Sequence, residues 1–266
     1  MQPFDLEFDS VKQLLDRETL RINTVDFIGN DPVQFPRRFD RLQDIEIAAF
    51  LCAAIAWGKR SMICRNCGKL LDIMGNDPSG FVRDRAYEDF PDEVNIHRTF
   101  FGRDLKYMLR GFHEIYASHS SLDDFAASRH VADSETPSWQ LVAEMQQVMS
   151  AANGGTTNSR CLPTNLAATA LKRVNMALRW LVRTDGIVDM GVWRSITPRQ
   201  LFVPLDVHVG NTARALGLVG RKANDRKTVL ELTEMLCLMR PDDPVAYDFA
   251  LFGIGIGDKY LAPKIE

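Results

Sequence analysis

One segment of the chain is apolar on almost every side. Residues 44–57 carry Ile, Ala, Leu, Phe and Cys side chains around nearly the whole circumference of a helix, and Gly58 ends the segment. A helix without a polar face is stable only in the middle of a core that other elements surround. The segment therefore predicts a domain with a large core and a central helix, for which Asp44 is the expected N-cap.

Most of the remaining chain shows the spacing of three and four residues between apolar positions that is typical of helices. Prolines 32 and 36 predict an extended loop over 27–41, and the glycine-containing stretch 152–165 predicts another. Few stretches alternate with a period of two, and there is no repeat or low-complexity linker. We expect one all-α domain over residues 1–266, built as two helical lobes around a cleft. The expected helices are 8–19, 44–57, 61–74, 78–85, 100–118, 122–128, 138–152, 166–183, 190–196, 207–216, 225–239 and 245–252.

The composition is that of an ordinary globular protein, with 45% hydrophobic and 25% charged residues. The net charge is −3, but residues 151–266 contain 15 Lys and Arg against 11 Asp and Glu, whereas residues 1–150 contain 17 against 24. No apolar run approaches the ~18 residues of a membrane span, and the N-terminus lacks the core of a signal peptide. We therefore expect a cytoplasmic protein.

The cysteines give no sign of a disulfide framework or a metal site. Their number is odd, and the pair Cys64 and Cys67 has neither a second pair nor a nearby His to complete a ligand set. We therefore expect no metal and no cofactor. The five cysteines are Cys52, Cys64, Cys67, Cys161 and Cys237.

Two helices carry the residues that suggest chemistry. An apolar segment with a proline delivers Asp206 to the predicted start of a helix, where a carboxylate can cap the helix and also face a cavity. On the helix upstream, Lys172, Arg179 and Arg183 follow one another at intervals of seven and four residues, which places them on one face. Three aligned cations suit a run of phosphates, or simply form a solvated basic face.

These two segments resemble known DNA-repair proteins. Residues 204–217, PLDVHVGNTARALG, resemble the V-D-T-H-V-x-R element of the helix-hairpin-helix (HhH-GPD) DNA glycosylase superfamily. Residues 172–180 resemble the lysine-bearing helix of its 8-oxoguanine glycosylase branches. Over most of its length, the chain also resembles the DUF2400 family of bacterial proteins, which is regarded as a remote member of that superfamily. The motifs shared with that family are 31–36, 53–60, 172–183, 204–208 and 243–252.

The resemblance implies an HhH-GPD-like fold and a DNA glycosylase or AP lyase that acts on damaged or abasic DNA. Lys172 would be the amine nucleophile at C1′ of the sugar, and Asp206 would be the carboxylate that stabilises the cationic transition state. The target base would leave the stack and enter a pocket with an aromatic wall, for which Trp57, Trp180 and Trp193 are candidates. The other candidates for contact with substrate or DNA are Arg173, Arg179, Arg183, His208, Arg214 and Asp248.

The chain departs from the superfamily in two places. Known members carry a glycine-rich hairpin before the catalytic helix, whereas residues 161–165 read CLPTN without the following glycines. The four-cysteine cluster of some members is absent. Two alternatives therefore stay open: a catalytically silent nucleic-acid-binding module, and an enzyme that binds a nucleoside or another small molecule in the same cleft.

Single residues also have alternative roles. Asp248 could form a buried pair with Arg179 or Arg183 instead of taking part in catalysis. His208 could satisfy a local hydrogen bond, and Arg214 could be a phosphate contact or a structural partner. The sequence indicates neither the base lesion nor the oligomeric state.

Overall fold

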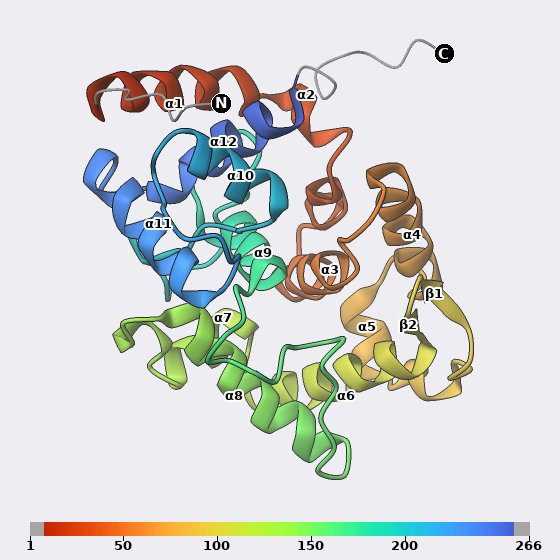
Figure 1. The fold of residues 1–266 in the computed structure, drawn as a ribbon. Helices are drawn as coiled ribbons and strands as arrows, with labels where there is room; N and C mark the ends of the chain where they lie inside the picture. The colour runs from red at the N-terminus through yellow and green to blue at the C-terminus, as the bar shows by residue number, and fades with distance from the viewer. Residues whose placement is uncertain (1–7, 258–266) are drawn as a thin grey trace, which may run out of the picture. The chain divides into compact units, whose positions relative to one another are not determined.

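The structure, a computed structural model, describes residues 8–257 and is mostly helical (Figure 1). Within these residues the only sheet is a two-stranded antiparallel hairpin of β1 (Asn95–His97) and β2 (Phe100–Phe101). The chain divides into two compact units. Of the described residues, unit 1 comprises 8–30, 167–191 and 197–257, and unit 2 comprises 31–166 and 192–196.

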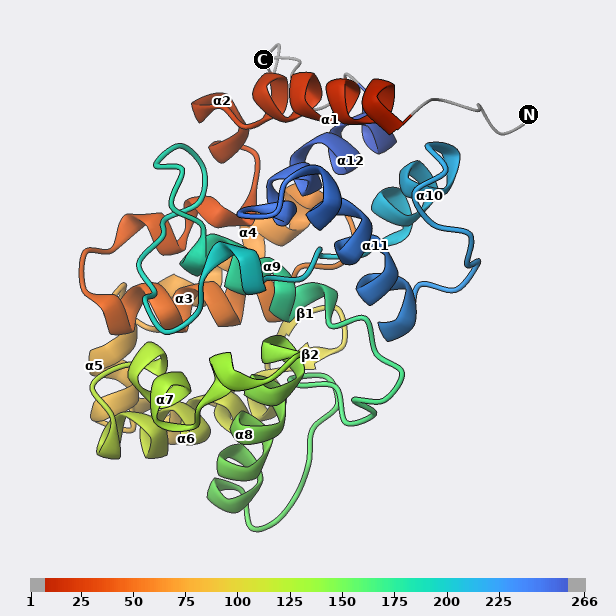
Figure 2. The ribbon, with the colours of Figure 1, turned by 90° about the vertical axis from the view of Figure 1, so that its left-hand side faces the viewer.

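Unit 2 is built around α3 (Leu42–Ala54), whose residues from Asp44 to Ala54 are all buried. The prediction of a central apolar helix is thus confirmed. α5 (Pro78–Arg83) packs against both α3 and α6 (Gly102–Ser118), and α6 lies along α8 (Pro137–Ala152) (Figure 2). α4 (Arg60–Ile73) and α7 (Leu122–Ser128) complete the helices of the unit. Two short 3₁₀ turns, Pro32–Gln34 and Pro36–Arg38, precede α3.

Unit 1 is built around α12 (Tyr247–Ile256), which packs against α1 (Phe8–Ile22) and α10 (Val207–Ala215) and lies under α1 in both views (Figures 1 and 2). Two glycines of α12 allow these close contacts. A Cβ atom on Gly253 would lie 2.7 Å from the Ile22 side chain, and one on Gly255 would lie 3.0 Å from the carbonyl oxygen of His208. The unit also contains α2 (Val25–Ile28), α9 (Lys172–Val182) and α11 (Arg226–Met239).

The structure corrects four of the predicted elements. The helix expected from Leu166 begins only at Lys172, because Leu171 adopts a left-handed backbone conformation with φ of 50° that no helix can continue through. Residues 190–196 form no helix, and their backbone is irregular. The helix expected from Phe100 begins at Gly102, after the hairpin. The expected loop 27–41 contains the end of α2 and the two 3₁₀ turns.

Asp44 is also not the N-cap of α3, because the helix begins one turn earlier and Arg41 occupies the cap position. The Asp44 carboxylate lies in the first turn, where it accepts a hydrogen bond of 2.7 Å from the backbone N–H of Ser79. It therefore joins α3 to the start of α5.

A single buried carboxylate organises the polar contacts of unit 2. Glu46 of α3 has no exposed surface, and its two oxygens accept four hydrogen bonds: from the Tyr116 hydroxyl (3.0 Å), the Trp193 indole N–H (2.8 Å) and the backbone N–H groups of Leu122 (2.8 Å) and Asp123 (3.0 Å). Burial raises the pKa of Glu46 to about 7, although the four donors favour the ionised form. Glu46 thus holds α6, α7 and residues 192–196 to the central helix.

The raised pKa makes the stability of the protein depend on pH through Glu46. The folded state binds this proton more tightly than the unfolded state, so the contribution of Glu46 to the free energy of unfolding falls as pH rises from about 4.5 to about 7. The loss is on the order of 3 kcal/mol. In Glu46→Gln this part of the pH dependence is absent, and urea unfolding at pH 5 and pH 8 would show a smaller difference than in wild type. The exposed Glu135→Gln should keep the wild-type difference; a Glu46→Gln curve that matches wild type would contradict the assignment.

Candidate functional site

Asp206 is held at the first turn of α10 by its own carboxylate. Its Oδ1 accepts a hydrogen bond of 3.0 Å from the backbone N–H of Val209, as an N-cap does. Its carbonyl oxygen accepts hydrogen bonds from the backbone N–H of Gly210 (2.9 Å) and from the Asn224 side chain (3.1 Å). The segment before it, residues 201–205, is largely buried. The predicted capping role is thus confirmed, and the side chain is fixed at the end of a rigid segment.

Lys172 occupies the first position of α9, immediately after the left-handed Leu171. Its side chain is half-buried, and its Nζ lies 3.4 Å from the Met176 sulfur one turn further along the helix. The approach to the helix is also fixed, because the carbonyl oxygen of Ala168 accepts a hydrogen bond of 2.9 Å from the backbone N–H of Arg226 at the start of α11. The backbone that carries Lys172 is therefore held in place on both sides of the turn into α9.

A third residue, Asp248 of α12, lies within electrostatic reach of both. Asp248 is buried, and burial is the main reason that its pKa rises to about 6. The positive charge of Arg179 opposes this rise, the negative charge of Asp206 adds to it, and the positive charge of Lys172 again opposes it. Lys172 and Asp206, which are 34 residues apart in the sequence, therefore both act on the buried carboxyl group of Asp248, which follows Asp206 by 42 residues; we call the three residues the Lys172–Asp206–Asp248 cluster.

Two buried arginines follow Lys172 along the chain, Arg179 in α9 and Arg183 at the C-terminal end of this helix. Arg179 pairs with Asp248 and, at 3.2 Å, with Asp189 in the loop after the helix. Arg183 pairs with Asp189, Asp185 and Asp243 at distances of 2.5–2.9 Å. Both guanidinium groups also lie over the ring of Phe249, with centroid distances of 4.3 and 5.5 Å. We call these residues the α9 ion network.

The α9 ion network corrects the prediction of a cationic stripe for phosphates. The exposed fraction is 4% for Arg179 and 1% for Arg183, and both side chains are occupied by carboxylates, so neither faces solvent. The alternative for Asp248, a buried pair with an arginine, is present in the structure. Of the three aligned cations, only Lys172 lies outside the core, and the neighbouring Arg173 is likewise half-buried.

The structure distributes the other predicted residues widely. Arg214 donates hydrogen bonds to the carbonyl oxygens of Arg221 (2.6 Å) and Ala223 (3.2 Å) and to the Asn224 side chain, which is a structural role. His208 is exposed on α10, with its ring 6.4 Å from that of Phe252.

The three tryptophans predicted as walls for a flipped base also differ in position. Trp180 has no exposed surface and belongs to the core, and the nearly buried Trp193 donates its N–H to Glu46 of unit 2. Trp57 is half-buried in unit 2, where its ring makes an edge contact with the His97 ring and the two ring centroids are 4.7 Å apart.

The sequence did not predict the carboxylate that pairs with both arginines, Arg179 and Arg183. Asp189 is fully buried between the two arginines. Its one signal in the sequence is its place inside the apolar stretch IVDM at 187–190, where a charged residue must find a buried partner. The same signal marks Glu46, which is an acidic residue inside the almost wholly apolar helix α3.

The segment before α9 differs from the hairpin of the glycosylases. α8 ends at Ala152, and residues 153–171 contain no helix, so no second helix directly precedes α9.

Among the described residues, no group of three or more His, Cys, Asp and Glu side chains is arranged to hold a metal ion. Between residues 8 and 257, no helix is long and apolar enough to cross a membrane.

The α9 ion network predicts a strong effect on stability. Arg179→Met leaves the buried Asp248 carboxylate without its guanidinium partner, so the free energy of unfolding should fall by about 3–5 kcal/mol. Arg17→Met removes an arginine that is 70% exposed and pairs with Glu18, and it should change stability by no more than about 0.5 kcal/mol. Urea denaturation measures both. Equal stabilities of the two variants would show that the network contributes little.

Comparison with known proteins identifies a family and no individual relative. The search of curated proteins and that of solved structures each found no match. The model of one family, described as "Protein of unknown function (DUF2400)", matches residues 31–257. The match covers most of both units, and the chain therefore belongs to the DUF2400 family.

Proposed function

We propose that this protein is a DNA glycosylase with AP-lyase chemistry, in which Lys172 is the nucleophile and Asp206 the essential carboxylate. The observation that carries the proposal is the Lys172–Asp206–Asp248 cluster: residues 34 apart in the sequence act on the same buried carboxyl group. The sequence resemblance to the HhH-GPD superfamily assigns the same two residues. The proposal thus rests on one motif and one electrostatic neighbourhood that agree.

The cluster contains the groups that the reaction requires. The amine of Lys172 would attack C1′ of the deoxyribose, the bond from C1′ to the base nitrogen would break, and the base would leave with a proton. After ring opening, the amine and C1′ would share an imine bond, from which the strand can be cleaved. Asp206 would stabilise the positive charge that develops on the sugar. Asp248, with a pKa of about 6, is able to exchange a proton near neutral pH.

The proposal needs few phosphate contacts from α9. Arg179 and Arg183 neutralise carboxylates in the core, and Arg214 holds a loop, so these three cations do not contribute to DNA affinity in the way that their sequence spacing implies. Lys172 and Arg173 lie at the beginning of the helix and are half-buried. The contribution of α9 to DNA recognition would therefore depend on contact with the reacting sugar more than on charge.

The lyase chemistry is tested by trapping with borohydride, which reduces the imine to a stable bond. Wild type should form a covalent adduct with abasic-site or 8-oxoguanine duplexes, and Lys172→Gln should form none, since the amine is missing while the helix is preserved by a good helix former. Lys227→Gln, which changes an exposed lysine of α11, is the matched control and should trap like wild type. Asp206→Asn should reduce turnover strongly but stability by only about 0.5 kcal/mol, because Asn caps as well as Asp.

The outcomes separate the three functions. An adduct that persists in Lys172→Gln would exclude this lysine as the nucleophile. Duplex binding without any adduct in wild type would favour the silent nucleic-acid-binding module. The absence of both would favour an enzyme that acts on a nucleoside or another small molecule.

The burial of the α9 arginines also predicts how DNA binding depends on salt. Because the amine of Lys172 would be directed at C1′, Arg173 is left as the phosphate contact of α9, and the plot of log affinity against log salt concentration should have a slope of about −1. Fluorescence anisotropy between 50 and 300 mM salt measures it. Arg173→Gln should make the slope shallower by about one, whereas a slope steeper than about −3 would require a basic surface outside α9.

A further inference from the structure

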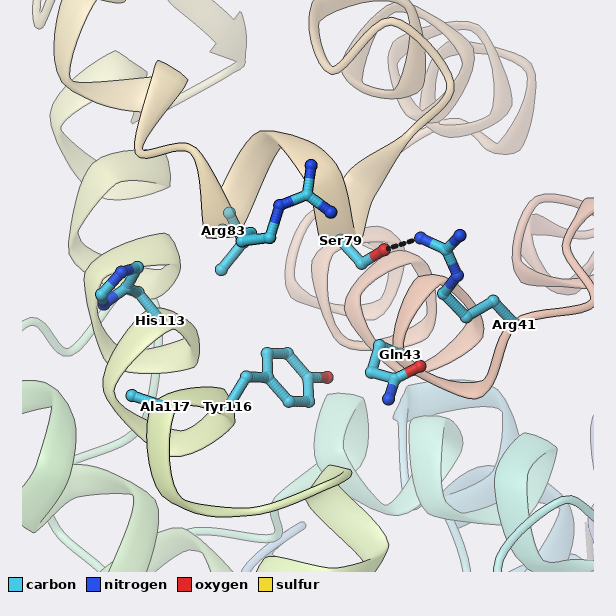
Figure 3. A pocket seen from close by; sticks show the side chains of 8 residues that line it. Arg41, Gln43, Ser79, Arg83, His113, Tyr116 and Ala117 are labelled. Atoms are coloured by element: carbon cyan, nitrogen blue, oxygen red, sulfur yellow. Dashed lines mark hydrogen bonds between the residues drawn. The ribbon is translucent and has the colours of Figure 1, made fainter.

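Unit 2 contains a pocket of about 430 Å³ that the proposed function does not use (Figure 3). Arg41 and Gln43 line it at the start of α3, Ser79 and Arg83 line it from α5, and His113 and Tyr116 line it from α6. Its volume lies within the range of ~300–1,000 Å³ that is typical of small-molecule sites. All its walls belong to one unit, so the pocket is complete without any residue of unit 1.

The walls are rigidly positioned by the helices that carry them. Ser79 and Arg83 are four residues apart and thus share one face of α5. Tyr116 and Ala117 lie three and four residues after His113, so the three residues share one face of α6. Because α5 packs against both α3 and α6, the two faces and the start of α3 enclose one space.

The side chains that face this space are cationic or neutral. Two arginines and one histidine line it, and no carboxylate does. In Figure 3 the guanidinium groups of Arg83 and Arg41 approach the space from α5 and from the start of α3, and Arg41 donates a hydrogen bond of 2.8 Å to the Ser79 hydroxyl. The Nε2 atom of His113 accepts a hydrogen bond of 3.1 Å from the guanidinium of Arg85, and its Nδ1 atom lies 3.2 Å from the Glu114 carboxylate, so the imidazole contributes its ring to the lining.

The carboxylates that pair with these arginines lie outside the lining. Arg83 pairs with Asp84 at 2.8 Å, and both side chains are mostly exposed to solvent. Arg41 is 3.8 Å from Asp77 and 3.9 Å from Asp44. The pairs with Asp84 and Asp77 are exposed on both sides, and such pairs contribute little to stability, so both guanidinium groups can turn from them to an incoming anion at low cost.

The remaining lining is apolar and suits an organic body. Val82 and Ala117 line the pocket, and the Tyr116 ring presents further carbon surface. The hydroxyl of Tyr116 donates a hydrogen bond to the buried Glu46, so the tyrosine would contact a ligand with its ring and not with its hydroxyl. A ligand held here would combine an anionic group with a ring or another apolar part.

We propose that this pocket binds an organic phosphate, with the phosphoryl group between Arg41 and Arg83 and the organic part against Tyr116, Val82 and Ala117. Guanidinium groups match phosphoryl oxygens in charge and geometry. The same chemistry occurs in a free nucleoside 5′-monophosphate and at the 5′-phosphorylated end of a DNA strand. The pocket lies beyond the proposed function and shares no residue with it.

Calorimetric titration with adenosine 5′-monophosphate, adenosine and inorganic phosphate tests the proposal. The monophosphate should bind, adenosine should bind at least about tenfold more weakly because it lacks the charge-assisted contacts, and inorganic phosphate should compete with the monophosphate. A 5′-phosphorylated trinucleotide that binds as tightly as the monophosphate would support a strand end as the ligand. Binding of the monophosphate alone would support a free nucleotide.

Variants locate the site. Arg83→Gln should weaken monophosphate binding about tenfold, and Ala117→Trp, which fills the pocket without changing charge, should abolish it. Arg103→Gln is the matched control, because Arg103 is also a half-exposed arginine of unit 2 in an ion pair, with Glu93, but does not line the pocket. Circular dichroism verifies that each variant is folded. Lys172→Gln should bind the monophosphate like wild type, which separates this result from the lyase test.

Three results would overturn the proposal. The first is the absence of monophosphate binding to wild type at millimolar concentration. The second is adenosine binding as tightly as the monophosphate. The third is binding that both Arg83→Gln and Ala117→Trp leave unchanged.

Discussion

The arrangement of unit 1 depends on two arginines buried beside one aromatic ring. Removing a guanidinium from water costs several kcal/mol, so it is stable in a core only when carboxylates surround it at close range. Arg179 and Arg183 meet this condition with carboxylates from the loop after α9, from α12 and from the residues just before it. The ion pairs therefore fix the loop and α12 relative to α9. Lys172 lies two turns before Arg179 on the same helix, so its position follows from the same contacts.

Asp248 connects this structural network with the candidate chemistry. It is the buried partner of Arg179, and it also responds to the charges of Lys172 and Asp206. Its pKa rises to about 6 because burial and the nearby Asp206 together outweigh the two cations. A structural ion pair and a role in catalysis are thus compatible in one residue. The burial of Asp248 in the packed helix α12 therefore affects its charge state as much as the residues that would touch a substrate do.

The sequence predicted those features that depend on local pattern. Apolar spacing located the helices and the central position of α3, and the residue type at position 206 predicted the cap of α10. It could not predict that α9 starts at Lys172, since a left-handed leucine has no sequence signature. The burial of Arg179 and Arg183 was predicted only as an alternative, in which one of them forms a buried pair with Asp248. Intervals of seven and four residues place side chains on one face of a helix but do not tell whether that face meets water or distant aspartates such as Asp243 and Asp248.

The burial of these arginines bears on what the net charge of residues 151–266 implies about DNA binding. Residues 151–266 carry a net positive charge, which favours a nucleic-acid partner when read from composition. In the folded chain, however, Arg179 and Arg183 face carboxylates, and Arg214 and Arg221 are engaged with the loop 221–225. A cation that is paired with a carboxylate releases few counterions from DNA, so an electrostatic contribution to DNA binding has to come from other cations of this half. The buried arginines therefore give no argument for a DNA substrate, and the proposal rests on an amine and two carboxylates in one neighbourhood.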